Sequence, residues 1–127
     1  MLALSQQACG YAEAQRAALD AVSGFHASFN GGRYAEIYHA SAAELREAVA
    51  EEEFCALLAG MEKKLGKHRR SEPGATHVAY APGATRVMMR IPSEFDAGGA
   101  SEDFTWLLGD ERPRLVSYNV SSPLLLK

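Results

Sequence analysis

The spacing of apolar residues divides the chain into two halves. Up to about residue 67 the apolar residues recur at intervals of three and four, which is the period of an amphipathic helix. Beyond about residue 75 they alternate with polar residues, as in a strand with one buried face. The sequence therefore predicts helices first and strands afterwards.

The first helix is predicted to be long and to end at the Asn30-Gly31-Gly32 turn. Its apolar side carries Ala18, Leu19, Val22, Phe25, His26 and Phe29. Asparagine and glycine tolerate the positive φ angles that end a helix. A short helix is expected next, with Tyr34, Ile37 and Tyr38 on its apolar side.

Two further helices are expected before residue 71. Ser41 and Glu44 have the spacing of a capping box, which predicts that a helix restarts there. The segment 51–70 opens with three glutamates and closes with a basic run, so charge at both ends favours the helix dipole. Its apolar stripe is Phe54, Leu57, Leu58, Met61 and Leu65. Gly66 is the expected stop, and the basic run 63–70 is interpreted as a solvated helix end.

The second half predicts about four strands. The inward positions are expected to be Val87, Met89, Ile91 and Phe95; Phe104, Trp106 and Leu108; and Val116, Tyr118 and Val120. A weaker run at 76–81 predicts one more strand, and 96–101 and 109–113 are the expected hairpin connections. Pro92 has no backbone N–H to donate, so it predicts an edge or a bulge at that point.

Helices followed by an antiparallel meander predict a single α+β domain over residues 1–127, with the helices packed on the concave face of a curved sheet. The outer face should be polar. It carries Arg86, Arg90, Glu94, Asp103, Thr105 and Arg114, with Met88 and Leu107 as apolar exceptions that leave room for a homodimer through this face.

Composition excludes several classes of protein. The net charge of −3 provides no general attraction to nucleic acid, and the basic run 63–70 has no interleaved aromatic residues for stacking on bases. No apolar run is long enough for a transmembrane helix, and no glycine-rich phosphate-binding motif is present. No histidine pair has metal-ligand spacing beside a carboxylate, so neither a metal nor a cofactor is predicted.

The N-terminal segment leaves localisation open between the cytoplasm and the cell envelope. Residues 1–10 are expected to be a poorly ordered leader or the remnant of an export signal, in which Cys9 would be the lipidated residue. Cys9 and Cys55 are either two free thiols or one disulfide, and the sequence does not choose between them.

The motifs FNGGRYAEIYHAS (29–41), EEEFCALLAGMEKKLG (51–66), FTWLL (104–108) and RLVSYNV (114–120) together resemble a family. The chain is similar to small bacterial domains of the nuclear-transport-factor-two-like superfamily, the cystatin-like α+β rolls, over roughly residues 15–121. The nearest branch is uncharacterised, and many of its members look like exported proteins or lipoproteins. The branch tends to carry an aspartate where this chain has Arg33, and a capping hydroxyl where it has Ala50. The resemblance implies a cone between helices and sheet, but superfamily members include enzymes, ligand binders and associative domains.

The side chains predicted to line this cone are His26, Tyr34, Tyr38, Met89, Trp106 and Tyr118. Ketosteroid-isomerase-like chemistry would need a carboxylate base beside such donors. Glu94 and Asp103 are expected to point outward, and Glu102 lies near a turn, so no catalytic residue is predicted. The leading hypothesis is a non-enzymatic domain that binds a small apolar ligand or a protein partner, or that self-associates. The alternative is a ketosteroid-isomerase-like or dehydratase-like enzyme, for which a carboxylate should lie within the cone.

Overall fold

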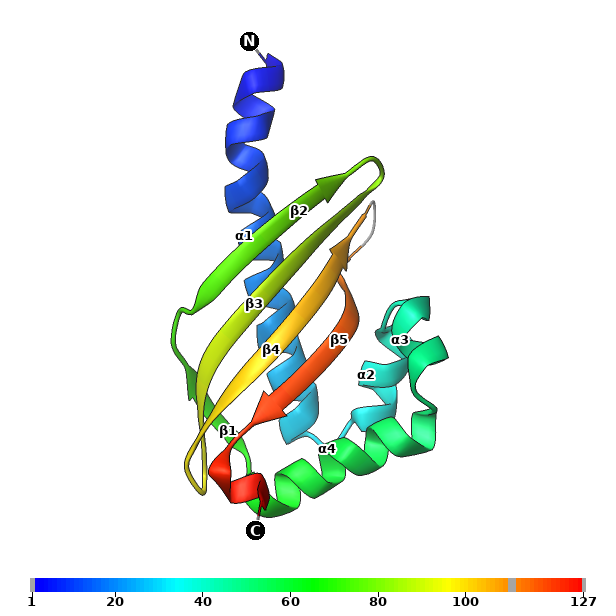
Figure 1. The fold of residues 1–127 in the computed structure, drawn as a ribbon, viewed down its shortest axis with the longest axis vertical. Helices are drawn as coiled ribbons and strands as arrows, with labels where there is room; N and C mark the ends of the chain where they lie inside the picture. Colours follow the sequence, from blue (N-terminus) through cyan, green and yellow to red (C-terminus); the bar gives the residue numbers. More distant parts are fainter. Residues whose placement is uncertain (1, 110–111, 127) are drawn as a thin grey trace.

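A computed structural model describes residues 2–109 and 112–126 of the chain, with side chains from residue 10 onward. It confirms an α+β fold in which helices precede an antiparallel sheet (Figure 1). The helices are α1 (Leu2–Asn30), α2 (Tyr34–Ala40), α3 (Ala43–Ala48) and α4 (Glu51–Leu65). The strands are β1 (His68–Ser71), β2 (Ala75–Ala81), β3 (Ala84–Phe95), β4 (Gly99–Leu108) and β5 (Arg114–Ser121), followed by the 3-10 turn η1 (Pro123–Leu126).

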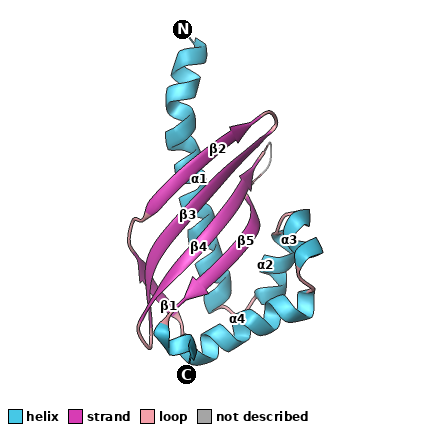
Figure 2. Ribbon diagram, in the orientation of Figure 1, coloured by secondary structure: helices cyan, strands magenta, loops and turns pink. Residues whose placement is uncertain are grey.

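The sheet has five strands where about four were expected. The additional strand is β1, which pairs with the last part of β3, while β2 pairs with the first part of the same strand (Figure 2). Strands β4 and β5 continue the sheet on the other side of β3. Part of the basic run, His68 to Arg70, therefore lies in a strand and not at a helix end, because α4 stops at Leu65 and Gly66 turns the chain with a φ of 81°.

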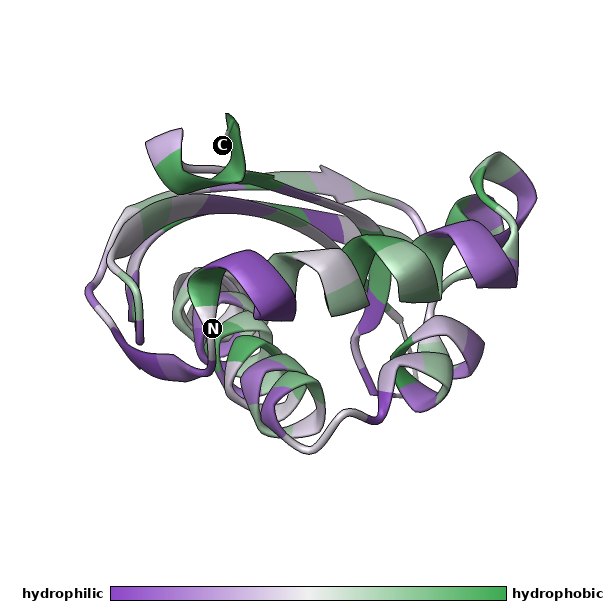
Figure 3. Cartoon of the chain, turned by 90° about the horizontal axis from the view of Figure 1, so that it is seen from below, coloured by the Kyte–Doolittle hydropathy of each residue, from purple (hydrophilic) through white to green (hydrophobic). Residues whose placement is uncertain are grey.

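The sheet curves over helix α1, so that the helices cover its concave face (Figure 3). The alternation predicted for β3 is confirmed, since Val87, Met89, Ile91 and Phe95 are all buried. They meet the buried side of α1, formed by Ala18, Val22, Phe25, His26 and Phe29. Leu19 and Leu57 were expected on the apolar stripes but are about half exposed.

The break between β1 and β2 lies opposite Pro92. Ser71 pairs with Ser93, and Ala75 pairs with Arg90. The three residues between Ser71 and Ala75 lie outside the two strands, so no strand pairing is required from the N–H that Pro92 lacks. Gly74 lies against the β3 backbone here, and a Cβ on it would lie 1.7 Å from the carbonyl oxygen of Arg90. The irregularity predicted at Pro92 is therefore the point at which the partner of β3 changes from β2 to β1.

A β-bulge changes the inward positions of β5. Trp106 pairs with Leu115 and Thr105 pairs with Ser117, so Val116 is the extra residue. Leu115 is buried in the core in place of Val116, which was predicted to point inward, whereas Tyr118 points inward as expected. The error arose because one inserted residue reverses the alternation on one side of the bulge.

The capping box predicted at Ser41 is absent. Helix α3 begins after Ala42 without a side-chain cap, and the Ser41 hydroxyl instead donates a 2.7 Å hydrogen bond back to the carbonyl of Ile37. Ser41 is buried and therefore completes the end of α2, where a carbonyl would otherwise lack a donor.

Helix α1 begins at Leu2, within the segment 1–10 that was expected to be a poorly ordered leader. Its first part projects beyond the sheet (Figure 1). The Cys9 side chain lies outside the described residues, so its lipidation stays a prediction, and Cys55 is a free thiol. Among the helices that the structure describes, none combines the length and the apolar character needed to cross a membrane.

Candidate functional site

A carboxylate is buried in the middle of the core. Glu102 of β4 has no exposed surface, and its oxygens accept hydrogen bonds from three side chains on three other elements. His26 of α1 lies 2.8 Å from Oε1, the Ser93 hydroxyl of β3 donates to the same oxygen over 2.6 Å, and the Tyr118 hydroxyl of β5 donates to Oε2 over 2.6 Å. These four residues are called the carboxylate cluster below.

Glu102 is the residue that sequence reasoning missed. It was placed near a turn, yet it shares the inward face of β4 with Phe104 and Trp106, and strict alternation would have found it. An ionisable residue at an inward position normally argues against predicting a buried strand, because burying an unpaired charge costs much free energy. Here three donors compensate it, and they come from elements distant in sequence.

The carboxylate cluster favours an ionised Glu102. Burial would raise the pKa of the Glu102 carboxyl, but the hydrogen bond and charge of His26, with the hydrogen bonds of Ser93 and Tyr118, outweigh it and lower the pKa. Burial raises the pKa of the Tyr118 hydroxyl, and the adjacent carboxylate raises it further. Tyr118 therefore stays protonated and remains a donor.

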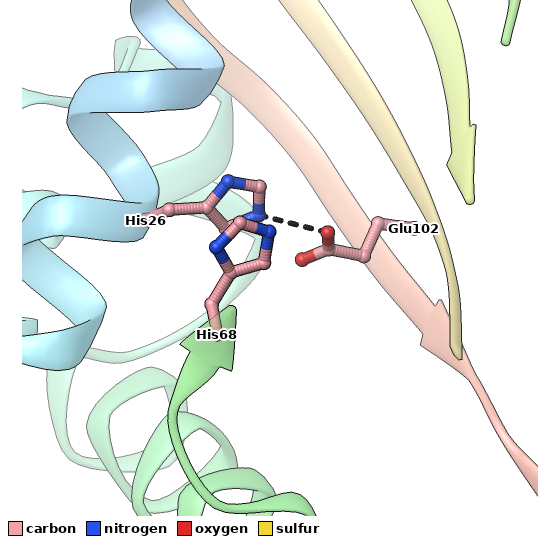
Figure 4. A group of neighbouring side chains, drawn as sticks. All are labelled: His26, His68 and Glu102. Carbon is pink, nitrogen blue, oxygen red and sulfur yellow. Dashed lines mark hydrogen bonds and ion pairs between the residues drawn. The ribbon is translucent and has the colours of Figure 1, made fainter. Parts of the chain in front are cut away.

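His68 of β1 extends the carboxylate cluster towards the surface. Its ring stacks on His26 with a centroid separation of 3.5 Å and an angle of 5° between the planes (Figure 4). Its Nε2 lies 2.8 Å from the Ser71 hydroxyl, which in turn lies 2.7 Å from that of Ser93. Partial burial, together with the charge of His26, lowers the pKa of His68 to about 4, so this imidazole is neutral near pH 7.

Two histidines and a carboxylate also form a set of metal-ligand types. In the described part of the chain, donor atoms of His26, His68 and Glu102 all lie within 4.8 Å of one another. However, the two rings are stacked, so their in-plane lone pairs lie in nearly parallel planes about 3.5 Å apart and do not converge on a point about 2 Å from both nitrogens. Glu102 also already accepts hydrogen bonds from three donors. The arrangement fits a hydrogen-bonded cluster, and the absence of a metal stays a prediction.

A separate cavity of about 690 Å³ lies between α1, α2 and the β4–β5 end of the sheet, and is called the central cavity. Its α1 wall is built from small residues at helical spacing, which are Ala17, Ala21, Gly24 and Ser28. A Cβ on Gly24 would meet nothing within 4 Å. Phe25 of the same helix also lines the cavity, and the opposite wall includes Ile37, Trp106 and Leu115. The central cavity exists because small side chains on α1 leave room opposite Trp106.

Trp106 contributes a polar group to this apolar wall. The side chain is about 5% exposed, and its indole Nε1–H is buried without an acceptor among the described residues. A buried donor without a partner costs about 1–3 kcal/mol, so native structures rarely keep one unless a ligand or a water molecule satisfies it. An acceptor that reached the indole N–H would therefore be stabilising, although the nitrogen itself has almost no exposed surface.

The other residues predicted to line the cone have different positions. Met89 is buried in the core. The Tyr38 hydroxyl donates to the carbonyls of Arg46 and Val49 over 3.1 and 2.8 Å, which ties α2 to the C-terminal end of α3. Tyr34 donates to Glu62, and burial together with that carboxylate raises the pKa of Tyr34 to about 12. Of the six predicted residues, His26 and Tyr118 meet through Glu102, and Trp106 lines the central cavity.

No protein-family model matches the chain, and no curated protein sequence is significantly similar to it.

Proposed function

We propose that this chain is a non-enzymatic roll domain of the nuclear-transport-factor-two-like superfamily that binds a small apolar molecule in the central cavity. The observation that carries the proposal is a mostly apolar cavity lined by Trp106, whose buried indole N–H has no acceptor among the described residues. The cavity volume of about 690 Å³ lies within the range of about 300–1,000 Å³ typical of ligand sites. The ligand would place an acceptor atom towards Trp106 and its apolar body along α1.

Fluorescence tests this proposal directly, because Trp106 is the single tryptophan of the chain. The probe is N-phenyl-1-naphthylamine, a neutral apolar dye whose emission rises in dry surroundings and whose absorption overlaps tryptophan emission. We expect saturable binding with quenching of Trp106 emission and an increase in Tm. Absence of saturable binding, with no Tm change for octan-1-ol either, would contradict the proposal.

The carboxylate cluster supports a second candidate, an acid–base enzyme of the ketosteroid-isomerase-like or dehydratase-like type. The specific observation is that Glu102 contacts both His26 and Tyr118. A hollow of about 340 Å³ is lined by His26 and His68 together with Leu19, Val22 and Ile91, and it could admit a substrate. In this candidate Glu102 orients His26. An imidazole transfers the proton, because the carboxylate has no exposed surface from which to reach a substrate.

Proton exchange distinguishes the two candidates. The enzyme candidate expects the wild-type protein to catalyse deuterium exchange at the carbon next to the carbonyl of a cyclic ketone, and expects His26→Gln and His68→Gln to abolish it. The binding candidate expects no exchange above the solvent rate from any of the three proteins. His77→Gln, an exposed histidine on β2, is the matched control.

A further inference from the structure

The edges of the sheet are strands β1, β2 and β5, because each of them has a single partner strand among the described residues. Edge strands expose unpaired backbone groups, and proteins usually protect them with charged side chains, bulges or covering segments. Strand β1 carries Arg69 and Arg70. Strand β5 contains the β-bulge at Val116, and its Leu115 carbonyl accepts the N–H of Ala42. These two edges are therefore protected.

Strand β2 shows none of these protections in the described part of the chain. Its sequence, ATHVAYA, contains no proline and no Lys, Arg, Asp or Glu. It pairs with β3 along its whole length without a register shift, so no bulge turns its outer edge away. It is therefore a regular, uncharged edge strand, of the kind to which another strand can add.

Alternate residues of β2 direct their backbone groups away from β3. Pro82 and Gly83 form a two-residue turn between the paired residues Ala81 and Ala84. The pair that closes such a turn exchanges hydrogen bonds, and every second pair of an antiparallel ladder does the same. The residues whose N–H and C=O groups face the free edge are therefore Thr76, Val78 and Tyr80. A strand added to this edge would pair with these three residues.

Helix α1 extends past the free edge of β2 (Figure 1). It passes the strand near Gln15, whose side-chain amide donates to the Thr76 hydroxyl over 3.3 Å. Ala14 is buried on the sheet-facing side of the helix, whereas Tyr11, three residues earlier on the same side, is 44% exposed. Tyr80 of β2 is 61% exposed. The sheet-facing side of α1 thus continues beyond the last strand, and each chain leaves two large aromatic side chains exposed.

We infer that β2 pairs antiparallel with β2 of a second copy of this chain, which joins the two sheets into one. The two-fold axis lies at Val78, so that Val78 pairs with Val78 of the second copy and Thr76 pairs with Tyr80 of the second copy. In this register every edge-facing residue lies opposite another edge-facing residue. All of their N–H and C=O groups can therefore exchange hydrogen bonds.

Charge and shape favour a second copy over an unrelated strand as the partner. The pairing brings no like charges together, because β2 carries no charged side chain. Thr76, Val78 and Tyr80 share the helix side of the sheet, so Tyr80 of the second copy would lie beside Thr76 and near α1. Each copy supplies what the other lacks, which is a strand under the exposed end of α1 and a helix over the added strand. Burial of aromatic surface favours this association.

Sedimentation velocity over about 1–200 μM protein tests this dimer, a range that covers the affinities of weak and moderate complexes. We expect wild type to shift with concentration to a species of twice the 13.7 kDa of one chain. Tyr80→Lys should weaken dimerisation at least about tenfold, because a lysine on an edge strand opposes pairing. Met88→Lys is the matched control, since it adds the same charge on the outer face of β3 and should leave dimerisation unchanged.

Amide hydrogen exchange of the wild-type protein locates the interface. The amides of Thr76, Val78 and Tyr80 should exchange more slowly at high than at low protein concentration, because pairing removes them from water. The amides of His77 and Ala79 face β3 and should be equally protected at both concentrations. This alternation along one strand is the signature of an added strand and does not depend on any variant.

The results that overturn the inference are specific. Wild type that stays monomeric at the highest concentration overturns it. A dimer that Met88→Lys dissociates and Tyr80→Lys does not would form through the outer face of the sheet, and also overturns it. A series of larger species overturns it as well, because one two-fold contact ends at two copies. None of these measurements involves a ligand, so they leave the proposed function to its own test.

Discussion

His26 of α1 and Glu102 of β4 lie 76 positions apart in the sequence, and their side chains meet over 2.8 Å in the core. The contact joins the long helix to the centre of the sheet. Because Ser93 and Tyr118 donate to the same carboxylate, four elements converge on one buried charge. Such a group specifies a single arrangement of helix and sheet, since any other arrangement leaves a buried charge without partners.

Glu102→Ala should therefore be strongly destabilising. Loss of the carboxylate leaves three buried polar side chains without their acceptor, which predicts a decrease in the free energy of unfolding of about 3–5 kcal/mol. Glu102→Gln keeps the shape and should cost about 1–3 kcal/mol. Urea denaturation measures both, and Glu94→Gln on the exposed face of β3 should change stability by less than about 0.5 kcal/mol. A decrease under 1 kcal/mol for Glu102→Ala would show that the cluster is not a stabilising centre.

Stability should fall as the pH is lowered through the titration of His68. Its pKa is about 4 in the folded protein against about 6.5 in the unfolded chain, so between these values the unfolded state binds more protons. The free energy of unfolding should therefore be highest above pH 6.5 and decrease down to pH 4. Because the ring is partly exposed, solvent screening reduces the expected loss to about 1–2 kcal/mol.

The variant His68→Gln isolates this contribution to the pH dependence. Urea midpoints at pH 7, 5.5 and 4 should show a weaker decrease for His68→Gln than for wild type. His77→Gln should keep the wild-type decrease. A wild-type profile in His68→Gln would mean that other groups, such as the carboxylates, cause the acid sensitivity.

Two glycines should respond in opposite directions to the same substitution. Gly74→Ala places a methyl group 1.7 Å from the Arg90 carbonyl oxygen, so the backbone must move where the chain changes partner on β3. We expect a loss of at least about 3 kcal/mol. Gly24→Ala lies within helix α1 with open space around the added carbon, so it should stabilise by about 0.5–1 kcal/mol. Thermal unfolding of both variants checks the signs, and a stable Gly74→Ala protein would contradict the close approach.

Filling the central cavity should block ligand binding without unfolding the protein. Ala21 lines the cavity on the α1 wall, and Ala21→Phe would occupy space that a ligand needs. We expect at least a tenfold loss of affinity for N-phenyl-1-naphthylamine, measured by fluorescence titration, with Tm within a few degrees of wild type. Ala27→Phe, on the exposed side of the same helix, is the control. Unchanged dye binding in Ala21→Phe would place the dye elsewhere.

Short-range patterns in the sequence were sufficient to predict the fold class and much of the core. The alternation of Val87, Met89 and Ile91 predicted the inward face of β3, and the helical spacing of Phe25 and Phe29 predicted the buried side of α1. These predictions succeeded because the period of a strand or helix is a local property, which tertiary contacts rarely reverse. Local patterns failed for β1, where the basic residues from His68 to Arg70 gave no apolar signal of an edge strand.

By itself, the sequence determined an α+β chain with helices before strands, an irregularity at Pro92 and a set of aromatic donors. Tertiary structure alone decided that Glu102 is buried, that His68 stacks on His26, and that small residues of α1 form a cavity wall opposite Trp106. Each of these depends on groups brought together from distant parts of the chain. A charge can be buried without a large cost only when several donors surround it. The donors come from different elements, so the residue spacing within one element cannot predict that they meet.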